Sequence, residues 1–381
     1  MPNTKFAVQE HLDYCLAQAT KTIAQLTENA LIPRNISPEE NTWNLVDYED
    51  WTSGFWPGVL WQLYDYTKDV EWKTKAEYFS NLLTPLSTRP AIDHDLGFQI
   101  YNSFGHGYRL TENPVFKEIV LNTAYSLADL FNPKVGTILS WPIMVEKMKW
   151  PHNTIIDNMI NLELLFWASR NGGSKHLYDI AAKHAETTMN NHFREDYTTF
   201  HVVVYDPITG KKIEGLTHQG YADESLWARG QAWAIYGFTM VYRETGDRRF
   251  LDFAQKVTDV YLERLPKDLI PYWDFDVPDI LNAPRDASAA AITASGLLEL
   301  SAYLSDTQKA AYYQEQAQQM IQNLSTEAFQ SRDQNPAFLL HSTGHYPNGS
   351  EIDYAIIYAD YYYLEALLRL HKKNNNKSII D

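Results

Sequence analysis

The chain alternates between two kinds of helical run, which differ in where the polar residues lie. Runs such as "GFWPGVLWQLY", "RGQAWAIYGFTMVY" and "SAAAITASGLLELSAYL" are apolar on all sides, as is typical of helices surrounded by other helices. Runs such as "FLDFAQKVTDVYLERL" carry charges on one face at a period near 3.6, as is typical of helices with one face in water. The pattern therefore predicts a layer of inner helices and a layer of outer helices.

Short polar breaks join these runs in pairs. Five breaks separate an apolar run from an amphipathic one, and they read "YTKDVEW" (66–72), "LTENPVF" (110–116), "SRNGGSKHL" (169–177), "RETGDRRFL" (243–251) and "LSDTQKAAY" (304–312). The N-terminal amphipathic run and the closing run "YAIIYADYYYLEALLRL" complete six outer and six inner helices. We predict an all-α chain, an (α/α)6 barrel forming one domain over 1–381. A β-hairpin is expected at 199–213, and a frayed tail at about 372–381.

Charge and hydropathy narrow the possible partners. The net charge is −16 and no basic stripe offsets it, which argues against nucleic acid and anionic membranes as partners. No apolar stretch reaches the length of a membrane span and the first residues lack a secretion signal, so we expect a cytoplasmic protein, or a periplasmic one if a leader was removed. The single cysteine, Cys15, cannot form an intrachain disulfide.

The loops that lead into the predicted inner helices share an acidic residue. They span 50–58, 93–98, 154–159, 218–233, 283–290 and 350–355. With 11 Trp, 25 Tyr and 16 Phe in the chain, these acids and nearby aromatic rings are suited to a sugar-processing site, where carboxyls move protons and rings stack on sugars. Each acid has a structural alternative, because aspartate is also a favoured N-cap of a helix.

Eight segments in order along residues 43–371 resemble the unsaturated glucuronyl hydrolases of glycoside hydrolase family 88. They are "DWTSGFW", "HDLGF", "IIDNMINL", "THQGYAD", "RGQAWAIYGF", "YWDF", "RDASAAAITASGLLEL" and "DYYYLEALLRL". The resemblance implies an (α/α)6 barrel and a small unsaturated oligosaccharide as substrate. It also implies hydration of the C4=C5 vinyl ether in the terminal uronic acid, which then separates from its neighbouring sugar. No cofactor or metal is expected.

The resemblance also implies roles for individual residues. Asp157 is the general acid and base, and Asp95 is the second catalytic aspartate, which holds sugar hydroxyls and assists protonation. The expected substrate-binding residues are Trp51, Trp141, His201, Gln219, Arg229 and Trp233. Structural alternatives stay open for these positions: helix capping for the two aspartates, a salt bridge for Arg229 and core packing for the tryptophans.

One segment departs from the family pattern. Streptococcal members that favour sulfated fragments carry Ser-x-x-Ser-x-Lys before the last inner helix, whereas this chain reads "HSTGHYPNGSEID" and lacks the lysine. A preference for sulfated substrates is therefore not implied, and Ser342, Thr343 and His345 are either contacts to a second sugar or a plain loop.

Other functions remain open at this point. The nearest alternative is an unsaturated rhamnogalacturonyl hydrolase, followed by an inverting glycosidase in which Asp95 and Asp157 act on a saturated bond. More distant alternatives are a hexosamine epimerase, a sugar-binding module and a metal site at Asp93, His94 and Asp95. We expect a monomer or a weak homodimer.

Overall fold

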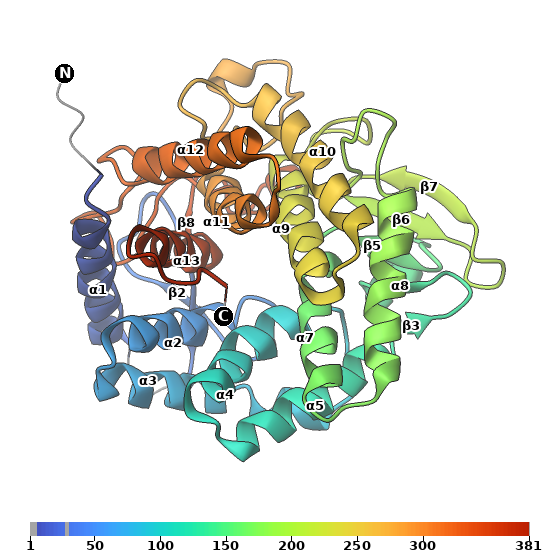
Figure 1. The fold of residues 1–381 in the computed structure, drawn as a ribbon, viewed down its shortest axis with the longest axis horizontal. Helices are drawn as coiled ribbons and strands as arrows, with labels where there is room; N and C mark the ends of the chain where they lie inside the picture. The colour runs from blue at the N-terminus through green and yellow to red at the C-terminus, as the bar shows by residue number, and fades with distance from the viewer. Residues whose placement is uncertain (1–5, 27–29, 381) are drawn as a thin grey trace.

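The helices of the computed structural model, which describes residues 6–26 and 30–380, alternate between two concentric layers (Figure 1). The outer layer contains α1 (Val8–Gln25), α3 (Val70–Asn81), α5 (Pro114–Ala128), α8 (Lys175–Asn191), α10 (Arg248–Arg264) and α12 (Thr307–Leu324). The inner layer contains α2 (Phe55–Thr67), η2 (Gly97–Gly105) continued by α4 (His106–Thr111), α7 (Asn158–Arg170), α9 (Ala228–Thr245), α11 (Ala287–Tyr303) and α13 (Ile357–Asn374). The predicted (α/α)6 barrel is confirmed.

Contacts between neighbouring inner helices close the barrel. Going round the ring, α2 contacts η2, η2 contacts α7, α7 contacts α9, α9 contacts α11, α11 contacts α13, and α13 contacts α2 again. Helix α11 is buried on every side over 287–301, whereas α10 buries one stripe that includes Phe250, Ala254 and Val257. The two polarity patterns therefore separate the layers as expected.

The polar breaks in the sequence supply the caps of the outer helices. In each case a side-chain oxygen accepts a hydrogen bond from the backbone N–H two residues further on; the capping residues are Asp69, Asn113, Ser174, Asp247 and Asp306. Each break thus ends an inner helix and starts the next outer one.

Within residues 6–26 and 30–380, three small sheets lie in the loops, so this part of the chain is not all-α outside the barrel. The predicted hairpin at 199–213 is present as β6 (Val202–Tyr205) and β7 (Lys212–Leu216), joined through Gly210 at φ +75°. A third strand, β5 (Asn153–Ile155), pairs with β6 and leads directly to Asp157. The remaining strands were not predicted, and they are β1 (Ile32–Ile36), β2 (Asn44–Val46), β3 (Phe131–Asn132), β4 (Thr137–Ile138) and β8 (Ala355–Ile356).

Short helical turns complete the loops: α6 (Pro142–Lys147), η1 (Thr84–Thr88), η3 (Ile280–Asn282) and η4 (Tyr346–Asn348). Helix α13 continues through Asn374, two residues into the tail predicted at about 372–381, and the fraying of that tail stays a prediction. No helix in 6–26 or 30–380 is long and apolar enough to cross a bilayer.

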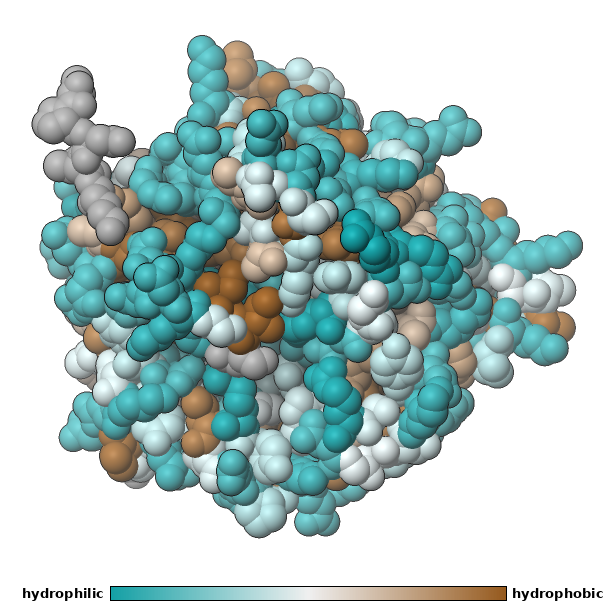
Figure 2. Space-filling model, viewed as in Figure 1, coloured by the Kyte–Doolittle hydropathy of each residue, from teal (hydrophilic) through white to brown (hydrophobic). Residues whose placement is uncertain are grey.

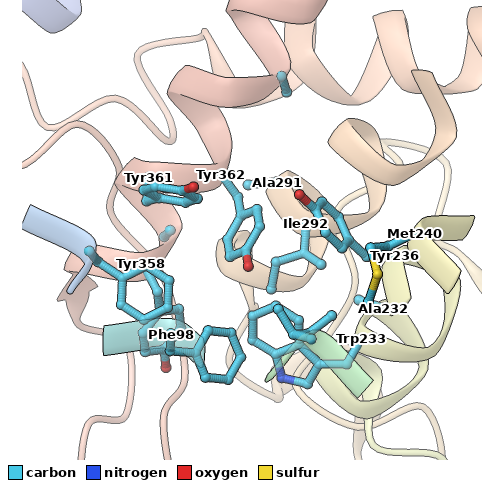
Figure 3. Packing of buried hydrophobic residues seen from close by; sticks show 14 of the residues in the cluster. Phe98, Ala232, Trp233, Tyr236, Met240, Ala291, Ile292, Tyr358, Tyr361 and Tyr362 are labelled. Carbon is cyan, nitrogen blue, oxygen red and sulfur yellow. The ribbon is translucent and has the colours of Figure 1, made fainter. Parts of the chain in front are cut away.

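Aromatic side chains fill the middle of the barrel (Figure 3). Phe98 and Trp233 have ring centroids 5.2 Å apart, and Trp233 meets Tyr362 at 5.4 Å. Tyr236 meets Tyr362 at 5.3 Å. All four residues are buried, so an aromatic layer separates the two ends of the barrel.

Beyond this layer, at the end where the inner helices finish, lies a cavity of about 390 Å³. Ile379 and Ile380 of the C-terminal segment contribute to its lining. Figure 1 shows the end of the described C-terminal segment near the barrel axis, and Figure 2 shows a hydrophobic group beside that axis on an otherwise largely hydrophilic face.

Candidate active site

Asp157 lies between β5 and α7, at the end of the barrel where the inner helices begin. The residue is 9% exposed, and its side chain makes no capping hydrogen bond to α7. Its Oδ2 has no hydrogen-bond partner within the described part of the chain. Asp286, at the matching position before α11, does cap its helix, by accepting from the N–H groups of Ser288 and Ala289. Capping therefore explains Asp286 and does not explain Asp157.

The hydrogen bonds of His201 determine which of its ring nitrogens carries the proton and faces Asp157. Its Nδ1 accepts hydrogen bonds from the backbone N–H groups of His218 and Gln219, both at 3.1 Å. Burial holds the pKa of His201 well below its usual value, so the ring is neutral and its proton must be on Nε2. Nε2 lies 3.7 Å from Asp157 Oδ2. The imidazole therefore presents an N–H group to this carboxyl.

The protonation state of Asp157 is set mainly by burial. Burial raises the pKa of Asp157 to about 7, against the opposing effect of the Arg229 charge. A carboxyl with such a pKa is present in both protonation states near neutral pH, as a group that both gives and takes a proton requires.

Asp95 is another buried carboxyl at this end of the barrel, with 8% of its surface exposed. Burial, together with the charges of Asp93, Asp157 and Asp50, raises the pKa of Asp95 well above its usual value. Asp95 and Asp157 therefore repel each other electrostatically when both are ionised, and the pair favours a state that holds at least one proton.

Arg229 provides the positive charge of the site from the first turn of α9. Its guanidinium pairs with Asp286 at 2.9 Å and donates to the carbonyls of Thr343 and Gly344. It also stacks over the ring of Trp227, 4.5 Å from the centroid. The salt bridge that the sequence left open is present, and Arg229 is only 2% exposed. Its contact with a substrate uronate stays a prediction.

The remaining sequence-predicted residues gather around this core. The Gln219 Oε1 accepts from Arg229 at 3.4 Å. Trp141 is partly buried, with ring centroids 5.8 Å from His201 and 5.5 Å from His218. Trp51, also partly buried, meets Phe98 at 5.6 Å. Trp233 is fully buried in the aromatic layer, so its ring lies beneath the site and has no exposed face.

The loop that differs from the streptococcal pattern borders the site. Thr343 binds Arg229 through its carbonyl, and the His345 ring lies 4.8 Å from that of His218. Ser342 is fully buried and pairs with Tyr354 through the backbone. Thr343 and His345 thus lie beside the expected sugar-binding residues, whereas Ser342 does not face solvent.

Several residues of the site escaped the sequence analysis. Trp227, His218 and Tyr358 contact predicted site residues through ring stacking or cation–π geometry. Trp227 immediately precedes α9 and His218 lies within "THQGYAD". The motif around His218 could therefore have indicated a site residue. Tyr358 lies in the aromatic run "YAIIYADYYY", and nothing in the sequence distinguishes it from the tyrosines around it.

Two other features are less suited to be the reactive centre. The three acidic and histidine side chains at 93–95 do not form a ligand set, and no cluster able to hold a metal occurs in 6–26 or 30–380. The 390 Å³ cavity lies at the opposite end of the barrel, where Glu163 is ion-paired with Arg243. Asp157 is therefore the stronger candidate for the reactive centre.

Comparisons with known proteins identify the family of the chain. Glycosyl Hydrolase Family 88 matches residues 17–373. An unsaturated glucuronyl hydrolase of Formosa agariphila is 44% identical over 342 residues, which cover 88% of this chain and 84% of the relative. An unsaturated chondroitin disaccharide hydrolase of Streptococcus pneumoniae is 33% identical, with 98% and 94% covered.

Solved structures agree as well. An unsaturated glucuronyl hydrolase specific for heparin superposes with a TM-score of 0.91 at 39% identity, covering 98% of both chains. The unsaturated glucuronyl hydrolase of Bacillus sp. GL1 gives a TM-score of 0.91 at 31% identity, covering 96% of this chain and 97% of that one. The chain therefore belongs to glycosyl hydrolase family 88, as the motifs in its sequence predict.

Proposed function

We propose that the chain removes the 4,5-unsaturated glucuronic acid from the non-reducing end of lyase-generated oligosaccharides by hydrating its C4=C5 bond. The observation that carries the proposal is the Asp157 carboxyl, which is buried, makes no capping bond and has a pKa raised by burial to about 7. Such a carboxyl starts the reaction protonated and can take a proton back.

The steps follow from this carboxyl. Asp157 donates its proton to C4, and positive charge develops at C5 and the ring oxygen. Water adds at C5 while the Asp157 carboxylate takes a proton from it, which restores the enzyme. The hemiketal at C5 then opens, and the neighbouring sugar leaves as an alcohol. The Nε2–H of His201, 3.7 Å from Asp157 Oδ2, stabilises the carboxylate that exists between the two proton transfers.

The other predicted residues assist the reaction or bind the substrate. Asp95 holds sugar hydroxyls beside Asp157 and assists the protonation of C4, whereas Gln219 and Arg229 bind the uronate. Arg229 supplies local positive charge in a chain of net charge −16, although its donors are largely engaged by Asp286 and backbone carbonyls. Trp51 and Trp141 keep part of their surface free for stacking on sugar rings.

The substrates proposed are fragments of glycosaminoglycans or of related bacterial polysaccharides. Relatives are named for chondroitin disaccharides and for heparin, and a streptococcal neighbour was solved in complex with dGlcA-GalNAc6S. The segment at 341–353 contains no lysine or arginine, and burial lowers the pKa of His345 to about 4, so this ring is neutral. We therefore propose that sulfated fragments hold no advantage over unsulfated ones. A cytoplasmic location and a monomeric or weakly dimeric state remain part of this proposal.

The test uses the ultraviolet absorbance of the conjugated C4=C5 acid, which hydration destroys. Wild type is mixed with unsaturated disaccharides from chondroitin, hyaluronan, heparin and gellan, and we expect the absorbance to fall. Asp157→Asn should lose the activity by about a thousandfold or more, because it can neither give nor take the proton. Asp306→Asn, the same chemical change at a capping residue of α12, is the matched control and should keep full activity.

Other outcomes separate the alternatives. Activity on unsaturated rhamnogalacturonan fragments alone would assign the chain to the rhamnogalacturonyl reaction. Release of sugar from saturated disaccharides would favour the inverting glycosidase. Unchanged absorbance with every unsaturated substrate would rule out the hydration mechanism.

A further inference from the structure

Two of the sequence motifs contain polar residues that the reaction above does not use. Asn161 lies one helical turn after Asp157 on α7, and it bonds to the loop that carries Asp95. Its Oδ1 accepts from the backbone N–H of Phe98 at 2.9 Å, and its Nδ2 lies 3.2 Å from Nδ1 of His94. A backbone N–H can only donate, so the orientation of the Asn161 amide is fixed. Nδ1 of His94 is therefore the acceptor of this bond.

The proton of the His94 ring must then be on its other nitrogen. The residue is fully buried, and burial lowers the pKa of His94 to about 3, so the ring is neutral. Nε2 lies 3.5 Å from Oδ1 of Asp95, and the side chain of Asn158 is a second neighbour able to accept. Nε2 makes no hydrogen bond within the described residues, so its N–H group is available to the Asp95 carboxyl 3.5 Å away.

Hydrogen bonds to Ser140 hold the same segments together. The N–H of His94 donates to the carbonyl of Ser140 at 3.1 Å. The hydroxyl of Ser140 accepts from Ile155 N–H at 3.0 Å and from Asn158 Nδ2 at 3.1 Å. The loop with Asp95 and the strand that leads to Asp157 therefore share one anchor, and the imidazole has little freedom to turn.

We propose that His94 is a positioning residue, which Asn161 holds as the Nε2–H tautomer so that it orients the Asp95 carboxyl toward the substrate. Each of the two carboxyls is then faced by a neutral, tautomer-fixed imidazole, His201 for Asp157 and His94 for Asp95. The inference rests on the proposed role of Asp95, but the tautomer of His94 does not depend on it. Loss of the orientation should lower kcat more than it raises KM, because Asp95 itself remains.

The first test measures the tautomer directly. Long-range ¹H–¹⁵N spectra of histidine-labelled protein distinguish Nδ1–H from Nε2–H rings, and His94→Gln assigns the signal. We expect the Nε2–H tautomer in wild type. Asn161→Asp should change it to an imidazolium or an Nδ1–H ring, because a carboxylate can only accept. An Nδ1–H ring in wild type would overturn the inference, whatever the activity of the enzyme.

The second test compares kinetic constants. His94→Leu removes the donor and should lower kcat by about 10- to 100-fold with KM changed less than about threefold. His94→Gln places an amide N–H near the position of Nε2–H and should recover at least about tenfold of that loss. His184→Leu is the matched control, since His184 is fully buried and its Nδ1 accepts from Ile138 N–H, and it should lower stability without changing kcat.

The outcomes are distinct from those of the function test. If wild type hydrates no unsaturated substrate, the proposed function fails, and the tautomer measurement still decides the state of His94. If wild type is active and folded His94→Leu keeps wild-type kcat, the positioning role is wrong. If His94→Leu does not fold, the two other variants decide. The positioning role would be wrong if His94→Gln and Asn161→Asp both kept the kcat of the wild type.

Discussion

At the scale of single residues, the difference between Asp157 and Asp286 comes from the backbone. Both precede an inner helix, but Asp286 has non-helical dihedrals of φ −127° and ψ 88°, and its carboxylate accepts from the free N–H groups of the helix. Asp157 already has helical dihedrals of φ −57° and ψ −28°, and its side chain makes no capping bond. The sequence could place both aspartates before helices, but it could not distinguish their roles, because the backbone angles depend on β5 and its pairing.

The raised pKa of Asp157 predicts a cost to folding that depends on pH. The folded protein retains this proton up to about pH 7, whereas the unfolded chain loses it near the usual aspartate value. Stability due to this group therefore falls as pH rises from about 4 to about 7. Asp157→Asn should be more stable than wild type by an amount that grows over this range toward roughly 4 kcal/mol, as measured by urea unfolding. An offset that does not change with pH would contradict the shift.

The same pKa predicts the pH dependence of the reaction. Asp157 must be protonated to begin, so kcat/KM should fall about tenfold for each pH unit above about 7. Steady-state assays of absorbance loss between about pH 5 and pH 9 would measure this. A rate that stays level through pH 8 would mean that another group donates the proton.

At the scale of elements, the contact between η2 and α7 holds the two carboxyl-bearing segments together. η2 is a π-helix over Gly97–Gly105, and a Cβ at Gly97 would lie 2.4 Å from Cα of Asn161. The sequence predicted an inner helix here but not its wider winding, because the run "GFQIYNSFG" is compatible with either form. The unpredicted strands have two to five residues, which is too short for alternation to be recognised.

Gly97→Ala tests this contact. The added methyl meets backbone, which cannot rotate away, so η2 must move from α7 at a cost of about 1–3 kcal/mol. Activity should fall as well, because Asp95 lies two residues before Gly97. Thermal unfolding and absorbance assays would measure both effects. Gly246→Asn is the control: its site at the end of α9 has φ +67° and nothing within 4 Å of a Cβ, and Asn tolerates that conformation. Equal stability of the two variants would contradict the close approach.

At the scale of the whole molecule, the two ends of the barrel differ in the side chains that they carry. Carboxyls and partly exposed tryptophans gather where the inner helices begin. At the other end, Arg243 pairs with Glu163 and Glu299, and the C-terminal segment lies against the cavity. The six-fold alternation of helices was predictable because every inner and outer run repeats the same pattern. The far cavity was not, because its charged residues are scattered over the ends of several helices.

Ile379→Ser together with Ile380→Ser tests the independence of the two ends. Both side chains line the far cavity and are partly buried, so we expect a loss of about 1–2 kcal/mol in unfolding free energy with kcat unchanged. Ile208→Ser, at a position that is 80% exposed, should cost almost nothing. A large fall in kcat for the double variant would mean that the two ends of the barrel are coupled.

The aromatic layer of Phe98, Trp233 and Tyr362 has a consequence for how a polymer is consumed. Because these rings fill the barrel beneath the carboxyls, no chain can thread through and emerge on the far side. A sugar must arrive by its terminus and its fragments must leave by the way they came. The enzyme should therefore act only at chain ends and release its products after each turnover. Its rate should depend on the concentration of chain ends and not on the mass of polymer supplied.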